Sequence, residues 1–219
     1  MTEMLLHGYF RSSAAWRVRI ALNLKGVPHA HAFRHLRRGE QSAPDYLAKN
    51  PQGLVPALEV PGPVGESQVL TQSLAILEWL EETQPGPKLL PADPWGRARV
   101  RALAQIVACD IHPIQNLRVL QYLKRDFGQA QPAIDAWVRH WVALGLAAFE
   151  ARLAEAETGR FCHGDAPGMA DCCLVPQLGN ARRFGADLAL YPRVLAVEAA
   201  CAALPAFVAA APGGQLDAE

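Results

Sequence analysis

A proline-rich segment divides the sequence into two parts of different secondary-structure character. The segment, residues 84–96 (QPGPKLLPADPWG), holds four prolines, which interrupt both helices and strand ladders. Before it, short apolar runs of strand length alternate with helical patterns, whereas the sequence after it carries almost no strand signal. We therefore expect an α/β domain over residues 1–84, a linker over 85–95 and an all-helical domain over 96–219.

The first part predicts strands and helices in the order βαβαββα. Its first helix should end at Gly26, because Pro28 follows as a stop signal. Pro56 interrupts a later apolar run and cannot donate to a ladder, so the strand there must be irregular. The expected strands cover residues 4–10, 30–36, 54–60 and 68–71, and the expected helices end at 26, cover 42–49 and begin at 73.

The second part is rich in Ala, Leu and Arg with helical period, which predicts helices over residues 97–125, 132–157, 169–184 and 192–203, followed by a tail of small residues. Arginines at positions 97, 99 and 101 spread around the first of these helices, so we expect them at the solvated surface. Asp171 suits a structural role near the start of the third helix. Cys172 and Cys173, adjacent in that helix, are expected to be core thiols.

Composition excludes several classes of partner. Acidic and basic residues balance at 21 each, so no net charge attracts nucleic acid or an anionic membrane. The five cysteines follow no metal-ligand spacing, and the N-terminus lacks a secretory pattern. We therefore expect a cytoplasmic protein with reduced thiols, small-molecule partners and no metal. No apolar run approaches the roughly 20 residues of a membrane-spanning helix.

Two adjacent serines stand where the first helix begins, in FRSSAAWRVRIAL (residues 10–22). One serine is enough to cap the free N–H groups of a first helical turn. A second hydroxyl there, together with those N–H groups and the partial positive charge of the helix start, would suit an anion. From the residues alone, capping and anion binding both remain open.

Six further stretches of the sequence carry recognisable motifs: NPQGLVPAL, LTQSLAILEWLEE, CDIHPIQN, MADCCLVPQ, NARRF and YPRV. Together with the serine stretch they are distributed over nearly the whole chain and resemble the zeta-class glutathione transferases. That resemblance implies a thioredoxin-like domain followed by a helical bundle, glutathione as cofactor, and a homodimer. It also implies a cis–trans isomerase acting on maleylacetoacetate in phenylalanine and tyrosine breakdown. The alternatives are maleylpyruvate in the gentisate pathway, a general conjugating transferase or dehalogenase, and a non-catalytic glutathione-fold module.

Such an isomerase uses glutathione as a nucleophile that adds to the cis double bond and is returned unchanged. Lowering a thiol pKa by two units needs about 2.7 kcal/mol. A helix terminus supplies about 0.3 to 1 kcal/mol, and a charge-assisted hydrogen bond about 1.5 to 3 kcal/mol. A hydroxyl is therefore needed beside the helix start. The resemblance implies that Ser12 contacts the sulfur and Ser13 supports or caps.

The resemblance also implies residues that bind the rest of glutathione. A cis bond between Val55 and Pro56 would turn the Val55 backbone towards the tripeptide. Gln72 and Ser73, a polar pair at a helix start, suit the γ-glutamyl carboxylate, although simple capping also explains them. Gln41 matches a residue near the glycine end.

The second part adds further residues by resemblance. His112 and Asn116 are four apart and would share one helical face if Pro113 is accommodated, with Gln115 as a nearby alternative. These three are implied to contact glutathione. An arginine fork should bind the substrate carboxylate, and the resemblance implies Arg11 and, in NARRF, Arg183, with its neighbour at 182 as the competing choice.

One departure from the family pattern lies in the serine motif itself. Ala14 and Ala15 stand where the zeta class usually has a cysteine and a serine. Alanine cannot form a mixed disulfide, so the departure argues against a redox role. It argues less against isomerisation, because that reaction needs only the glutathione sulfur.

Overall fold

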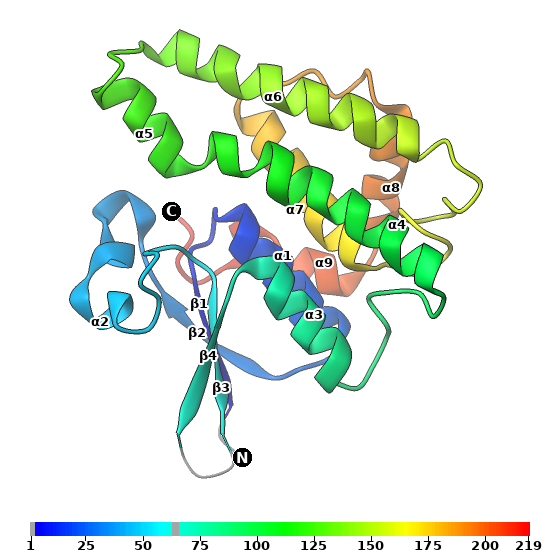
Figure 1. Cartoon of the computed structure of the whole chain (residues 1–219), viewed down its shortest axis with the longest axis horizontal. Coiled ribbons are helices and arrows are strands. Elements are labelled where there is room, and N and C mark those ends of the chain that lie inside the picture. Colours follow the sequence, from blue (N-terminus) through cyan, green and yellow to red (C-terminus); the bar gives the residue numbers. More distant parts are fainter. Residues whose placement is uncertain (1–2, 63–65) are drawn as a thin grey trace. The chain divides into compact units, whose positions relative to one another are not determined.

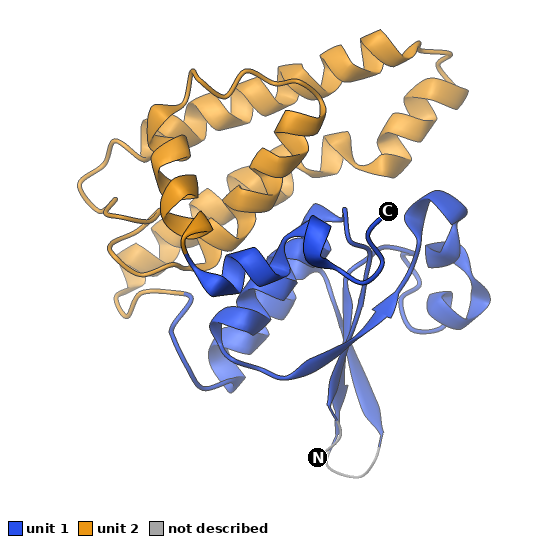
Figure 2. Cartoon of the chain, turned by 180° about the vertical axis from the view of Figure 1, so that it is seen from behind, with its two compact units in different colours: residues 1–89, 204–219 blue, residues 90–203 orange. Residues whose placement is uncertain are grey.

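The computed structural model describes residues 3–62 and 66–219 (Figure 1). The chain forms two compact units: its N-terminal part as far as Leu89 together with Leu204–Glu219, and Leu90–Ala203 (Figure 2). The first unit carries the sheet and the second is helical, so the expected α/β plus all-α architecture is confirmed. No helix in the described part of the chain is long and apolar enough to cross a membrane.

The sheet of the first unit has four strands in the order β2-β1-β3-β4. The two N-terminal strands pair in parallel, and the other two pairings are antiparallel. The third strand begins only after the bond between Val55 and Pro56, which is cis, so the expected irregularity is confirmed. The strands are β1 (Met4–Gly8), β2 (His29–Phe33), β3 (Ala57–Pro61) and β4 (Ser67–Thr71).

Helices cover both faces of this sheet. Figure 1 shows α1 (Ser13–Leu24) and α3 (Ser73–Thr83) on one side and α2 (Pro44–Leu47) on the other. The first side is packed by fully buried aliphatic residues, among them Leu6, Leu58 and Leu80. The second side has an aromatic core cluster of Tyr9, Phe10, Tyr46, Val55 and Ala57.

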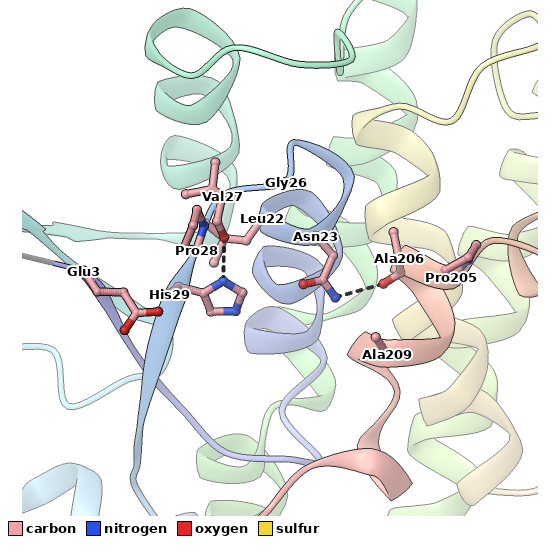
Figure 3. Close-up of a pocket in the computed structure, with 10 residues that line it drawn as sticks. All are labelled: Glu3, Leu22, Asn23, Gly26, Val27, Pro28, His29, Pro205, Ala206 and Ala209. Carbon is pink, nitrogen blue, oxygen red and sulfur yellow. Dashed lines mark hydrogen bonds between the residues drawn. The ribbon is translucent and has the colours of Figure 1, made fainter. Parts of the chain in front are cut away.

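The C-terminal segment belongs to the sheet-bearing unit, although the sequence placed it in the helical domain. This tail of small residues contains a helix, α9 (Pro205–Ala210), which packs on α1. Asn23 of α1 donates to the carbonyl of Ala206 at 3.1 Å (Figure 3). The short Ala-rich helix has little stability of its own, and this packing supplies the missing burial.

The second unit consists of helices joined by irregular turns. The helix expected over residues 97–125 is interrupted: α4 continues into a π-helical turn, Ile106–Ile111, and the chain restarts after Pro113 with Asn116 as the N-cap. Proline lacks the N–H that a continuous helix needs at this point. The long helices are α4 (Pro94–Gln105), α5 (Leu117–Arg125), α6 (Gln131–Arg152), α7 (Met169–Arg183) and α8 (Pro192–Ala202).

The structural role expected for Asp171 is confirmed. Its carboxylate is 1% exposed and accepts the N–H groups of Gly168 at 2.8 Å and Cys162 at 2.9 Å. The first bond caps α7, and the second fixes the loop before it. Cys172 and Cys173 are fully buried, as expected for core thiols.

Three groups of charged side chains are paired within the fold. The expectation of a surface position fails for Arg99, which is 7% exposed and donates to Glu155 and to the Cys162 carbonyl. Lys25 lies 3.3 Å from Glu81 beneath the end of α3. Glu59 of β3 binds both His7 and Lys49, which joins β1 to β3 through side chains as well as through the ladder.

Candidate active site

The first part of the candidate site is the N-terminus of α1, which the chain reaches from β1 through residues 9–12. Ser12 is the N-cap residue, and its Oγ accepts a hydrogen bond from the Ala15 N–H at 3.2 Å. Ser13 lies inside the helix and is 6% exposed, whereas Ser12 is half-buried. The structure therefore assigns the cap to Ser12 itself rather than to its neighbour.

Capping leaves part of the Ser12 hydroxyl available. A hydroxyl carries one O–H donor in addition to two acceptor lone pairs, and the bond from Ala15 uses only a lone pair. The O–H proton can therefore be donated to an anion in front of the helix while the oxygen caps it. Capping and anion binding, which the sequence left as alternatives, are compatible in this one side chain.

The second part is the start of α3, where Gln72 precedes Ser73. Gln72 has a φ of +67°, a conformation that costs a non-glycine residue on the order of 1–3 kcal/mol and occurs preferentially at functional sites. The side-chain amide of Gln72 donates to Gln52 Oε1 at 2.7 Å, and Gln72 is exposed. Ser73 is buried, at 6% exposure, and faces inward.

Arg17 connects the starts of α1 and α3. Its side chain is 1% exposed, and its guanidinium donates to Ser73 Oγ at 3.2 Å. A permanently charged group thus lies directly behind the polar start of α3, where it favours an anion. Sequence reasoning missed this residue. The available signal was an arginine placed in an otherwise apolar helical stretch.

The third part is the loop that leads into β3. Tyr46 and Asn50 both donate to the Leu54 carbonyl, at 2.6 and 2.7 Å, and hold the chain just before the cis bond. Among the described residues, no backbone hydrogen bond joins the N–H or C=O of Val55 to another backbone group. Those two groups fit the strand-like pairing with a tripeptide that the sequence predicted.

Gln41 packs against the same loop. A Cβ added at Gly53 would lie 3.2 Å from the Gln41 carbonyl oxygen, so the two backbones are in close contact. The side-chain Oε1 of Gln41 is buried without a hydrogen-bond partner in the described part of the chain. A buried amide oxygen of this kind is normally satisfied, so it fits an external donor. The first unit thus brings Gln41, the Val55–Pro56 loop, the Gln72–Ser73 pair and α1 into one connected set.

The second unit does not place His112 and Asn116 on one helix, because the helix does not continue through Pro113 as that expectation required. His112 ends the π-helical turn, Pro113 begins a 3₁₀ turn, and Asn116 caps α5 by accepting the Arg118 N–H at 3.2 Å. Gln115, the predicted alternative, is 4% exposed, and neither its amide oxygen nor its nitrogen has a partner among the described residues.

The predicted substrate arginines are both exposed and stack on aromatic rings. The guanidinium carbon of Arg11 lies 4.9 Å from the centre of the Phe10 ring, and that of Arg183 lies 4.8 Å from the centre of the Phe184 ring. Arg182, by contrast, forms a two-pronged ion pair with Glu198. This contact occupies the guanidinium of the competing arginine.

Buried cysteines do not supply a thiolate. Desolvation raises the pKa of Cys162 and Cys172 well above 9.0, and the nearby Asp171 adds to the rise. Burial likewise raises the pKa of Cys201. These three thiols stay protonated at neutral pH and do not act as nucleophiles. The shallow pocket in Figure 3, lined by Glu3, His29 and residues of α1 and α9, contains none of the predicted site residues.

Comparisons with known proteins identify the family of this chain. Residues 11–83 match the sequence model of the glutathione S-transferase N-terminal domain, and residues 121–200 match that of the C-terminal domain. A maleylpyruvate isomerase from a Ralstonia species is 53% identical, covering 98% of this chain and 99% of that protein. The chain belongs to the glutathione S-transferase family. A second relative of this family, maleylacetoacetate isomerase from Rhizobium meliloti strain 1021, is 49% identical over 96% of each protein.

Solved structures of the glutathione S-transferase family confirm the fold and the class. The holo structure of a maleylpyruvate isomerase, described as a bacterial zeta-class glutathione S-transferase, superposes with a TM-score of 0.94 at 52% identity and covers 98% of this chain and 100% of that one. Maleylacetoacetate isomerase from Anaeromyxobacter dehalogenans 2CP-1, solved with glutathione in its active site, gives 0.89 at 50% identity over 99% and 98% of the two chains. The resemblance to the zeta class is thus confirmed.

Proposed function

We propose that this chain is a glutathione-dependent cis–trans isomerase that converts maleylacetoacetate to fumarylacetoacetate. The observation that carries the proposal is the double use of Ser12, whose oxygen caps α1 while its O–H remains able to donate to a thiolate. Full-length relatives that bear isomerase names support it. Among the described residues, Gln41 Oε1 has no hydrogen-bond partner and Val55 makes no backbone–backbone hydrogen bond, which fits a bound tripeptide.

The candidate residues of the first unit that would bind glutathione each have a role in this proposal. When bound, glutathione supplies the nucleophile that adds to the cis double bond and leaves again. Ser12 and the start of α1 favour its ionised sulfur. Gln72 and Ser73 bind the γ-glutamyl carboxylate, and the buried charge of Arg17 strengthens that binding. Val55 pairs with the tripeptide backbone, and Gln41 binds near its glycine end.

The roles of the remaining candidates rest on the family resemblance. We assign His112, Gln115 and Asn116 to further contacts with glutathione. Gln115 is the best supported of these, because its buried amide lacks partners among the described residues. We assign Arg11 and Arg183 to the carboxylate and keto oxygens of the substrate. Ser13 and Pro56 support the neighbouring contact residues.

Maleylpyruvate is the second candidate substrate, because a relative named for it is 53% identical to this chain. The test is to follow loss of the cis-alkene absorbance with each substrate, with and without glutathione. We expect turnover of maleylacetoacetate at the higher kcat/KM and no net consumption of glutathione. A higher kcat/KM for maleylpyruvate would transfer the assignment to that substrate. Stoichiometric loss of glutathione would identify a conjugating transferase, and failure to bind it a non-catalytic module.

Two arginine variants sharpen the substrate assignment. Arg183→Ala should raise KM for the keto acid at least ten-fold, since an arginine–carboxylate contact contributes about 1.5 to 3 kcal/mol. Arg182→Ala, the matched control, removes a neighbouring guanidinium that is already bound to Glu198 and should leave KM unchanged. Equal effects of the two substitutions would contradict the role of Arg183.

We also propose that the protein works as a homodimer in the cytoplasm. None of the five cysteines, all of which the structure describes, forms a disulfide, which suits a reducing compartment. Light scattering coupled to size-exclusion chromatography would test the dimer, and a mass of 23.7 kDa for the eluted species would contradict it.

A further inference from the structure

The turn that carries Ser12 is held from outside by the distant C-terminus of the chain. Within the turn, the only backbone bond shown is from the Ser12 N–H to the Tyr9 carbonyl, at 2.9 Å, among the described residues. The Phe10 N–H donates to Asp217 Oδ2 at 2.9 Å, although the two residues are 207 positions apart. The conformation of the turn therefore depends on a carboxylate that the sequence gives no reason to place there.

Arg19 holds the other side of the same residue. Its guanidinium donates to the Phe10 carbonyl at 3.0 Å and, through Nε, to the Ala210 carbonyl at 2.9 Å. The side chain is 3% exposed, and burial lowers its pKa to about 10, against the opposing effect of the Asp217 charge. Arg19 thus joins the turn to the end of α9. Both backbone groups of Phe10 are bonded to charged side chains.

The last residue adds a third attachment. Glu219 accepts from His35 at 2.6 Å and from Arg38 at 3.4 Å, and the His35 ring lies edge-on to Tyr9 with 5.0 Å between ring centres. The hydrogen bond from His35 is the main cause of the lowered pKa of Glu219. The segment 210–219 is therefore fixed at Ala210, Asp217 and Glu219. Ala210 is bound to Phe10 through Arg19, Asp217 binds Phe10 directly, and Glu219 binds His35, whose ring contacts Tyr9.

We propose that the segment 210–219 positions the catalytic turn, with Asp217 as the main positioning residue and Arg19 as its counterpart. The inference deepens the proposed function and rests on it. Asp217 does not touch the reacting atoms. It acts by fixing Phe10, two residues before the Ser12 hydroxyl, so that the hydroxyl and the start of α1 face the same point. A charged acceptor is well suited to this, because hydrogen bonds to charged groups are stronger than neutral ones.

The test compares Asp217→Ala with Asp217→Asn. The amide oxygen of asparagine still accepts from the Phe10 N–H, whereas alanine leaves that N–H without an acceptor. We expect Asp217→Ala to lower kcat/KM about ten-fold and to raise the pKa of bound glutathione, with Asp217→Asn recovering most of both. Asp165→Ala is the matched control, because Asp165 also accepts a backbone N–H, from Arg160 at 3.0 Å, in a loop of the other unit. It should change neither quantity.

A double-mutant cycle with Ser12→Ala separates positioning from general destabilisation. If Asp217 acts through Ser12, Asp217→Ala should have little further effect on the thiol pKa once the hydroxyl is gone. Measured in fully folded protein, an equal effect in both backgrounds would overturn the proposal. So would wild-type kinetics and thiol pKa in Asp217→Ala.

Hydrogen exchange distinguishes failure of this proposal from failure of the proposed function. The amides of residues 9–12 should exchange faster in Asp217→Ala than in the wild type, with no substrate present. Faster exchange in a protein that proves unable to bind glutathione would support the attachment and refute the enzymatic role. Unchanged exchange in an active isomerase would refute the attachment alone.

Discussion

Ser12→Ala and Ser12→Gly should separate the two roles of Ser12, as the N-cap of α1 and as an O–H donor to the glutathione sulfur. Both variants lose the O–H donor, but glycine is a better N-cap residue than alanine. Ser12→Ala removes both the acceptor for the Ala15 N–H and the O–H donor. Loss of an N-cap costs about 1 kcal/mol of stability, or roughly 2–4 °C in Tm for a chain of this length. Loss of a charge-assisted hydrogen bond of about 1.5 to 3 kcal/mol should raise the pKa of bound glutathione by about 1–2 units.

Ser12→Gly keeps most of the cap and none of the hydroxyl. Glycine at an N-cap costs only a few tenths of a kcal/mol relative to serine. This variant should therefore melt close to the wild type and yet show the same raised thiol pKa as Ser12→Ala. Its isomerase rate at neutral pH should fall roughly ten- to hundred-fold, in step with the thiolate fraction.

Ultraviolet titration of the glutathione complex, combined with thermal melting, measures both quantities. The matched control is Asp93→Ala, which removes the cap of α4, where Asp93 accepts the Gly96 N–H at 2.7 Å. It should lower Tm like Ser12→Ala and leave the thiol pKa alone. If the pKa of bound glutathione in Ser12→Gly equals the wild-type value, the hydroxyl only caps the helix, and the reasoning fails.

Three further predictions concern stability. Gly145→Ala places a Cβ 2.2 Å from Ile111 Cγ1 and should lower the free energy of unfolding, measured with denaturant, by about 1–3 kcal/mol. The loss should be smaller in an Ile111→Ala background, and additive losses would contradict the clash. Lys25→Met should cost about 3–5 kcal/mol because it leaves Glu81 buried and unpaired, whereas a loss below 1 kcal/mol would mean that water reaches the carboxylate. Desolvation raises the pKa of Glu59, but hydrogen bonds from Lys49 and His7 outweigh it and lower this pKa below 4.5. The stabilisation from Glu59 is therefore complete above pH 4.5 and is lost as the pH falls through the pKa of the folded state. Glu59→Gln should make the free energy of unfolding depend less on pH in this acidic range, and an unchanged pH dependence would refute the prediction.

Local pattern was enough to predict most of the first unit. Short apolar runs, the stop at Gly26 and Pro28, and the polar start at Ser73 set the order of strands and helices, because these signals act within a few residues. The serine pair and the Gln72–Ser73 pair were found for the same reason. The expectation of one helix over residues 97–125 failed at Pro113, where a π-helical turn and a 3₁₀ turn replace a continuous helix.

The sequence by itself thus determined the two architectures, the family resemblance and the identity of the polar residues at the two helix starts. Only the tertiary structure decided which serine caps α1, that Arg17 lies behind Ser73 and that Arg99 is buried rather than solvated. It alone brought Asp217 to the Phe10 N–H. The physical reason is that capping and helical period depend on neighbours in the chain, whereas burial of a charge and long-range hydrogen bonds depend on which distant segments pack together.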